Sequence, residues 1–188
     1  MVKKEGEDML YLEDKNMFYP ISIALDNVKT RLTVFTIFLA IAASAPLIFH
    51  NQFLTGPIVN AMLFIITYLL GPYYGIAASI IPSGMAVGIG LLPVVLLPMI
   101  GFIIIGNIIL VSVFNSFKRK NLYIGFISAA IAKFVFIYAM SSVILRLYLK
   151  TNLSASVASM VGINQLYTAL LGGLIAYAFL KSFNKKLN

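Results

Sequence analysis

The chain has 188 residues, of which 61% are hydrophobic and 11% are charged. Soluble domains carry about 25% charged and about 45–50% apolar residues, and a soluble fold of this size has too small an interior for so much apolar surface. The composition therefore indicates an integral membrane protein. The chain contains no cysteine and one histidine, His50, which excludes thiolate and multi-histidine metal sites within one chain.

Acidic and basic residues are separated along the chain. All six carboxylates precede residue 27, eleven Lys and Arg residues follow it, and the net charge is +8. The basic residues do not form one dense patch, so nucleic acid is not an expected partner. The apolar region lacks carboxylates for a proton relay or for acid–base chemistry, and it lacks a nucleotide-binding loop. We therefore expect neither an enzyme nor a self-powered pump, and no cofactor.

The chain divides into three parts. Residues 1–31 are polar and mixed in charge, which predicts a cytoplasmic segment, residues 32–183 are apolar, and residues 184–188 form a cytoplasmic tail. Because about 20 residues span a bilayer, the apolar part predicts an all-α domain of six transmembrane helices. They are expected at residues 32–49, 55–70, 73–90, 94–116, 122–146 and 156–181. The second and third are short and end near proline and glycine, which indicates tilted or partly re-entrant segments.

The basic residues also predict the orientation of these helices. Lys29 and Arg31 precede the first helix, and six crossings would bring Lys118–Lys120 and the C-terminal lysines to the same side. The opposite loops contain only Arg146 and Lys150 as basic residues. The positive-inside rule therefore places both termini in the cytoplasm. We expect a multi-pass protein of the plasma membrane of a bacterium.

A lysine in the middle of the fifth predicted helix is the first candidate binding residue. Lys133 lies ~12 residues, or ~18 Å, from either helix end, which is farther than a lysine side chain reaches. A charge at that depth costs about 2.5–3.5 kcal/mol on insertion scales, and the apolar part offers no carboxylate partner. Either an anionic group of a ligand satisfies the ammonium, or the lysine has a structural role, in which it is neutral or is satisfied by helix-end carbonyls, Asn and Ser side chains or water.

Amide side chains in three other predicted helices are further candidates. These residues are Asn60, Asn107, Asn164 and Gln165. Amides in lipid must be paired, so they either hydrogen-bond between helices or face a shared cavity that binds a polar ligand. The depths of Asn107 and Asn164 are comparable to that of Lys133, which predicts one pocket in the outer half of the membrane. Asn51 and Gln52, in the loop before the second helix, are candidates for closing it.

Small residues recur every four positions in the first predicted helix, at Thr36, Ala40 and Ser44. Small residues at this spacing let helix backbones approach closely. The face that they form either packs inside the protein or docks another membrane protein. Ala40 and Ser44 are the candidate docking residues.

Several segments carry a resemblance to a known family, over roughly residues 30–183. They are Ala40–Ser44, Thr55–Asn60, Gly71–Pro72, Pro98–Asn107 and Ala132–Phe134. With the chain length and the six predicted helices, they resemble the substrate-binding S component of an energy-coupling factor (ECF) transporter. The last four segments look like those of S-component-like proteins without an assigned substrate.

The resemblance implies a function and partners. It implies that the outer half of the chain binds a vitamin or similar micronutrient and that the first helix docks on a transmembrane coupling protein. Two cytoplasmic ATPase subunits would then drive release of the ligand inside. The family usually has two alanines four positions apart in this helix, where the present chain has Ala40 and Ser44. A pocket with Lys133 and amides but no carboxylate favours a neutral or anionic ligand. A stand-alone permease and a structural membrane protein without ligand are the alternative functions.

Overall fold

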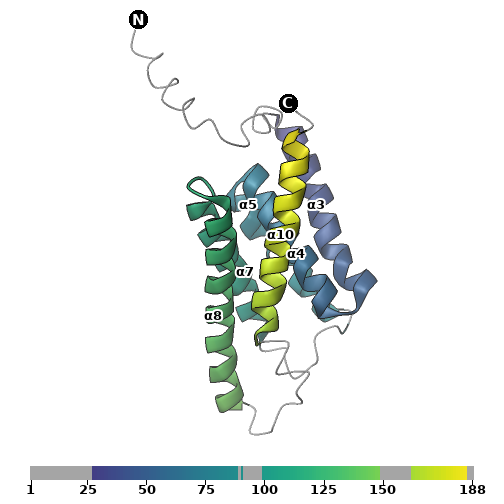
Figure 1. Ribbon diagram of the computed structural model, residues 1–188. Helices are drawn as coiled ribbons and strands as arrows, with labels where there is room; N and C mark the ends of the chain where they lie inside the picture. Colours follow the sequence, from purple (N-terminus) through teal and green to yellow (C-terminus); the bar gives the residue numbers. More distant parts are fainter. Residues whose placement is uncertain (1–26, 89, 91–98, 149–161, 186–188) are drawn as a thin grey trace, which may run out of the picture.

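The computed structural model describes residues 27–88, 90, 99–148 and 162–185, and these residues form helices and turns without a strand. The helices pack side by side into a bundle (Figure 1). They are α3 (Val28–Phe49), α4 (Gln52–Leu70), α5 (Pro72–Ala78), α6 (Ile81–Gly88), α7 (Ile100–Phe117), α8 (Leu122–Tyr148) and α10 (Asn164–Lys185). The expectation of an all-helical chain is confirmed over this part.

Five helices in the described ranges are long and apolar enough to cross a membrane. They cover Val28–Phe49, Gln52–Leu70, Ile100–Phe117, Leu122–Val143 and Ile163–Phe183. These segments correspond to five of the six predicted spans and identify a multi-pass membrane protein. The first helix begins at Val28, so it includes residues assigned to the polar N-terminal segment. Parts of the predicted helices 94–116 and 156–181 lie outside the described residues.

The third predicted helix, 73–90, differs from the expectation because it is divided into α5 and α6. Pro82 has no amide hydrogen to donate to the carbonyl of Ala78, and its ring clashes with that carbonyl in a continuous helix. At the break, the Ser79 hydroxyl donates to the Gly75 carbonyl at 2.9 Å. Ser79 is fully buried, and irregular backbone at membrane depth is tolerated where protein surrounds it.

Asparagine side chains determine where three helices start. Asn27 accepts a hydrogen bond from the amide of Lys29 at the start of α3, and Asn51 accepts one from Phe53 at the start of α4. Asn121 accepts from Tyr123 and also from Ile124 before α8. Such caps satisfy amide hydrogens that have no partner inside the helix.

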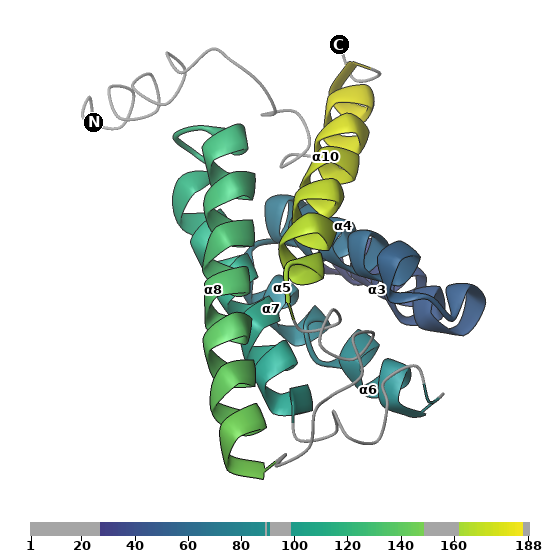
Figure 2. The same ribbon diagram turned by 60° about the horizontal axis from the view of Figure 1, so that its bottom comes forward.

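Two sharp turns connect the first three helices. His50 has a left-handed backbone with φ 30° between α3 and α4. Gly71 has φ 99° between α4 and α5, a conformation that glycine adopts at low cost. Pro72 then starts α5, where its missing amide hydrogen costs nothing. The starts of α3, α5 and α8 and the ends of α4, α7 and α10 therefore lie at one end of the bundle (Figure 1). Figure 2 shows α6 toward the opposite end.

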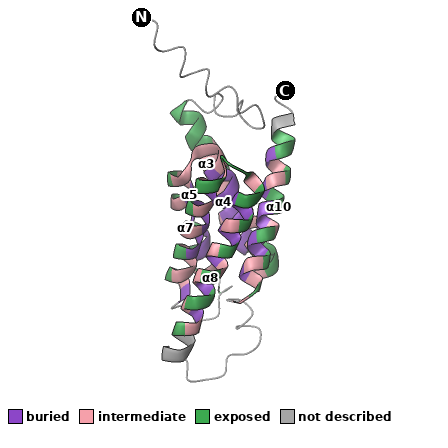
Figure 3. Ribbon diagram, turned by 60° about the vertical axis from the view of Figure 1, so that its left-hand side comes forward, coloured by how far each residue is buried: buried purple, intermediate pink, exposed green. Residues whose placement is uncertain are grey.

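The helix α4 forms the centre of the bundle (Figure 3). More than half of its apolar stretch is buried (56%), against 17% for α3. Phe64 of α4 contacts Phe114 of α7 and Phe126 of α8, each with ring centroids 4.9 Å apart. Close to this aromatic cluster, the Lys118 ammonium donates to the Thr67 carbonyl at 2.8 Å. These contacts hold α4, α7 and α8 together on the side of the basic loop.

Candidate functional site

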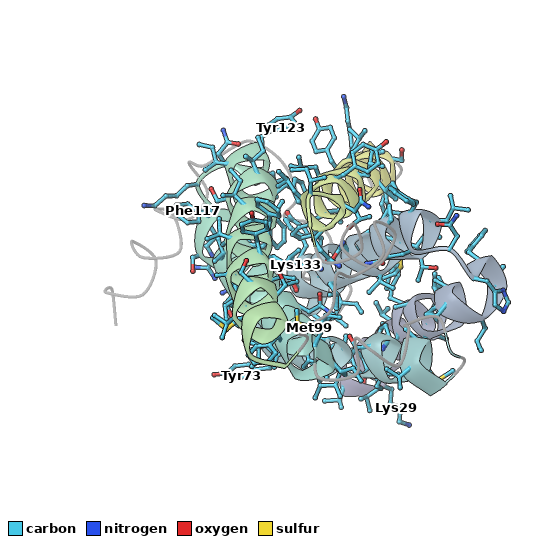
Figure 4. All side chains as sticks on the ribbon, turned by 90° about the horizontal axis from the view of Figure 1, so that it is seen from below. Lys29, Tyr73, Met99, Phe117, Tyr123 and Lys133 are labelled. Carbon is cyan, nitrogen blue, oxygen red and sulfur yellow. The ribbon has the colours of Figure 1, made fainter. Side chains whose placement is uncertain are left out.

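Lys133 lies in the interior of the bundle, on α8. Its side chain is 3% exposed, and seen from below it lies toward the centre of the surrounding helices (Figure 4). The ammonium donates one hydrogen bond to Oδ1 of Asn60 on α4 and another to Oδ1 of Asn107 on α7, both at 2.7 Å. The structure thus brings together three of the residues that the sequence analysis selected, and they join three helices.

Two glycines allow the asparagines to approach Lys133. A methyl group on Gly106, the neighbour of Asn107, would lie 2.8 Å from Cδ1 of Ile137 on α8. A methyl group on Gly172 of α10 would lie 2.6 Å from Cβ of Asn60 and 2.9 Å from the backbone nitrogen of Ala61. Because its neighbours are a Cβ and backbone atoms, Gly172 is required for the observed distance between α10 and α4, whereas a methyl group on Gly106 would require the Ile137 side chain to move. Close backbone approach at small residues is the usual way in which membrane helices associate.

A cavity of about 90 Å³ adjoins these three polar residues. Its wall comes from α3, α4, α6, α7, α8 and α10. The lining residues are Pro46, Gln52, Thr55, Gly56, Val59, Asn60, Pro82, Ser83, Ala86, Ile103, Asn107, Lys133, Gln165 and Thr168. From Gln52 to Asn60 the cavity follows two turns of α4, or ~12 Å at 1.5 Å per residue. It therefore lies on the side of the bundle away from the basic loop.

The polar lining combines one group that only donates, the Lys133 ammonium, with amide and hydroxyl groups that can donate or accept. The ammonium of Lys133 has three hydrogens, and two are used for the asparagine oxygens. Asn60 and Asn107 turn their oxygens toward Lys133, so their amide NH₂ groups do not take part in these two hydrogen bonds. The hydroxyl oxygen of Thr55 is buried and has no hydrogen-bond partner among the described residues. No carboxylate lines the described cavity, and the sequence has none after Asp26.

Two of the other amides selected from the sequence also line the cavity, and two occupy different positions. Gln52 and Gln165 line it, and Gln165 is buried. Asn51 is exposed and caps α4 through its side-chain oxygen. Asn164 is the half-buried first residue of α10 and does not belong to the described lining. The structure therefore gives Asn51 a structural explanation and leaves Asn164 outside the described cavity wall.

The sequence analysis missed the hydroxyl and proline residues of the cavity wall. Thr55, Ser83 and Thr168 line it together with Pro46 and Pro82. Part of this set follows a helical pattern, since Gln52, Thr55, Gly56 and Asn60 recur at spacings of three and four along one face of α4. The residues of α6 reach the cavity wall because the chain breaks before Pro82. The sequence analysis predicted one continuous helix there and therefore did not select them.

The candidate docking residues lie on α3. Ala40 is exposed and Ser44 is half-buried, with the Ser44 hydroxyl donating to the carbonyl of Ile41 at 3.1 Å. Ala42 and Ala45 are buried against the bundle. The helix thus uses one small-residue face for packing and leaves Ala40 on another face.

Comparisons with protein-family models, with curated proteins and with solved structures gave no match.

Proposed function

We propose that the chain is the substrate-binding subunit of an ATP-driven importer of the ECF type, and that the cavity beside Lys133 binds a neutral or anionic micronutrient. The observation that carries this proposal is a buried lysine held by two amide oxygens at the wall of a cavity to which six helices contribute. Ligand sites in helical membrane proteins are built in this way, from polar residues that face the bundle interior.

The topology belongs to the same proposal. The α5–α6 pair returns the chain from the end of α4 to the start of α7, so that the pair takes the place of the sixth crossing (Figures 1 and 2). Lys29, Lys118–Lys120 and Lys181 then share one side, which the positive-inside rule assigns to the cytoplasm. The cavity opens in the outer half of the plasma membrane, where an import substrate arrives.

The proposed partners are a transmembrane coupling protein and two cytoplasmic ATPase subunits. The chain has no nucleotide-binding loop of its own, so energy for import has to come from another subunit. The exposed part of α3 around Ala40 is the surface that the family resemblance assigns to the coupling protein. Its low burial supports this assignment, because a helix that is covered by a partner needs little contact inside its own bundle.

Purification from native membranes tests the proposal directly. Mass spectrometry of small molecules extracted from the purified protein is expected to find one compound in the wild type and to lose it in Lys133→Met. Asn115→Ala, on α7 but outside the described cavity wall, serves as the control and should retain the compound. Equal amounts in the wild type and Lys133→Met would contradict the binding site.

Reconstitution separates the proposed function from the alternative ones. Vesicles that contain this chain alone should bind the compound without accumulating it, whereas vesicles that also contain the coupling protein and ATPases should accumulate it with ATP. Transport by the chain alone would instead identify a permease. The absence of any ligand together with a normal fold in Lys133→Met would identify a structural protein.

A further inference from the structure

The cavity wall carries hydrogen-bond donors for which a bound ligand would supply the acceptors. Lys133 has one ammonium hydrogen beyond the two that reach Asn60 and Asn107. Asn60 and Asn107, which line the cavity, use their side-chain oxygens for Lys133 and also carry amide NH₂ groups that can donate. The hydroxyl of Thr55 is buried and unpaired there as well. Four side chains thus supply donors to one region of the wall.

The positive charge of Lys133 also favours a ligand that supplies acceptor groups. Lys133 is 3% exposed. The two amide oxygens accept hydrogen bonds from its ammonium group, but they carry no charge that would balance it. No acidic residue follows Asp26 in the sequence. A buried charge without a counter-charge is costly in a membrane, and the described residues include no carboxylate, so an anionic ligand would complete the site.

We propose that the cavity binds a small monocarboxylate, whose carboxylate oxygens accept hydrogen bonds from Lys133, Asn60 and Asn107. This inference rests on the proposed function and adds the chemical class of the ligand. One carboxylate balances one ammonium, whereas a phosphate monoester carries about −1.5 to −2 at pH 7 and would leave excess negative charge in the interior. A cationic ligand would be repelled by Lys133, and a neutral one would leave its charge unbalanced.

The size of the cavity limits the rest of the ligand. Pockets for drug-sized molecules have volumes of ~300–1,000 Å³, whereas this cavity has about 90 Å³. It accommodates a carboxylate with a short carbon chain. The apolar side chains of Val59 and Ile103, which belong to the same wall, suit such a chain.

A single substitution can place the missing charge inside the protein. Asn107→Asp keeps the shape of the side chain and replaces an amide oxygen, 2.7 Å from the ammonium, by a carboxylate oxygen. The new carboxylate then occupies the role of the ligand. We expect the melting temperature of the ligand-free protein to rise and its affinity for carboxylates to fall at least tenfold. Asn115→Asp makes the same change on α7 outside the described wall, and it should retain wild-type affinity.

The experiment uses the full chain purified in detergent and melted at constant ionic strength. The probes are acetate, propionate and butyrate, their neutral amides, the corresponding primary amines, and inorganic phosphate. Carboxylates are expected to raise the melting temperature of the wild type at concentrations at least tenfold lower than the amides, while amines and phosphate have no specific effect. Lys133→Met should remove the preference for carboxylates over amides.

The possible failures are distinguishable. If amides or phosphate stabilise as well as carboxylates, or if Asn107→Asp retains full carboxylate affinity, the carboxylate inference is wrong. The proposed function survives that result if Lys133→Met still loses the compound that co-purifies with the wild type. If neither the probes nor a co-purifying compound depends on Lys133, both the inference and the proposed function fail.

Discussion

Lys133 and its two asparagines respond differently to substitution because only one of them carries charge. Burying the ammonium costs about 2.5–3.5 kcal/mol, and two hydrogen bonds to a charged group return about 1.5–3 kcal/mol each. Removing the lysine therefore removes opposing contributions of similar size. Removing an asparagine leaves the charge in place with one acceptor fewer.

This difference predicts that an apolar substitution of the lysine changes stability less than an apolar substitution of an asparagine. Lys133→Met should change the unfolding free energy by less than about 2 kcal/mol, whereas Asn107→Leu should destabilise by about 1–3 kcal/mol through the unpaired donor. Unfolding in detergent measures both values. A large loss of stability in Lys133→Met, with none in Asn107→Leu, would show that the lysine is chiefly a structural link between helices.

The close contact at Gly172 makes a second prediction at this scale. Gly172→Ala places a methyl group 2.6 Å from Cβ of Asn60 and 2.9 Å from the Ala61 nitrogen, which forces α10 away from α4. Overpacking of this kind costs about 1–3 kcal/mol, and the displaced Asn60 should also weaken binding. Gly101→Ala is the matched control, because nothing lies within 4 Å of its new methyl group. Equal melting temperatures for both variants would contradict the tight contact.

Individual site residues were predictable where their chemistry is unusual. Lys133 is conspicuous because a charge in an apolar run needs a partner, and Asn60 and Asn107 lie close to it in the structure. Asn51 has the same chemistry as these two, but its place directly before a helix makes it a cap. Thr55 and Ser83 give no such signal, since hydroxyls in membrane helices commonly bond to their own backbone.

At the scale of helices, the division of the third predicted helix is the main departure from the sequence-based expectation. An apolar run of eighteen residues suggests one span, but Pro82 breaks it locally. The consequence is functional, because the break places Pro82, Ser83 and Ala86 at the cavity wall. Periodicity alone cannot show this, since the direction in which the chain continues after a break depends on packing against α3 and α7.

The start of α8 offers a prediction for a single element. Asn121 accepts hydrogen bonds from the amides of Tyr123 at 2.9 Å and Ile124 at 3.2 Å, so Asn121→Ala should cost about 1 kcal/mol of stability. Asn115→Ala removes an amide that makes no such bond and should change stability by less than about 0.5 kcal/mol. Thermal or denaturant unfolding of the two variants provides the measurement. Equal stabilities would mean that water replaces the cap.

At the scale of the whole molecule, the absence of native cysteine allows a direct test of topology. Lys120→Cys and His50→Cys introduce single thiols at opposite ends of the bundle, in the α7–α8 turn and the α3–α4 turn. A membrane-impermeant thiol reagent added to intact cells should label position 50 and not position 120. After the membrane is permeabilised, both should react. Labelling of position 120 in intact cells would reverse the proposed orientation.

The uncovered side of α3 provides the last prediction for the whole assembly. Ala40 is exposed although the neighbouring alanines at positions 42 and 45 are buried, so a larger side chain at position 40 does not disturb the bundle itself. Ala40→Phe should therefore retain ligand affinity and melting temperature while reducing ATP-dependent uptake at least tenfold, because a close helix–helix contact requires small residues.

Leu174→Phe tests whether this effect is specific to α3. Leu174 lies on α10 and is 63% exposed, so it presents a comparable apolar surface to the surroundings, but it is already large. Its enlargement should leave uptake unchanged if the partner docks on α3. Equal loss of uptake in both variants would place the coupling surface elsewhere, and loss of ligand binding in Ala40→Phe would mean that α3 supports the cavity. The two variants thus distinguish docking of the partner from support of the cavity as roles of α3. The roles can be separated because Pro46 of α3 lines the cavity, while Ala40 lies almost two helical turns away from Pro46.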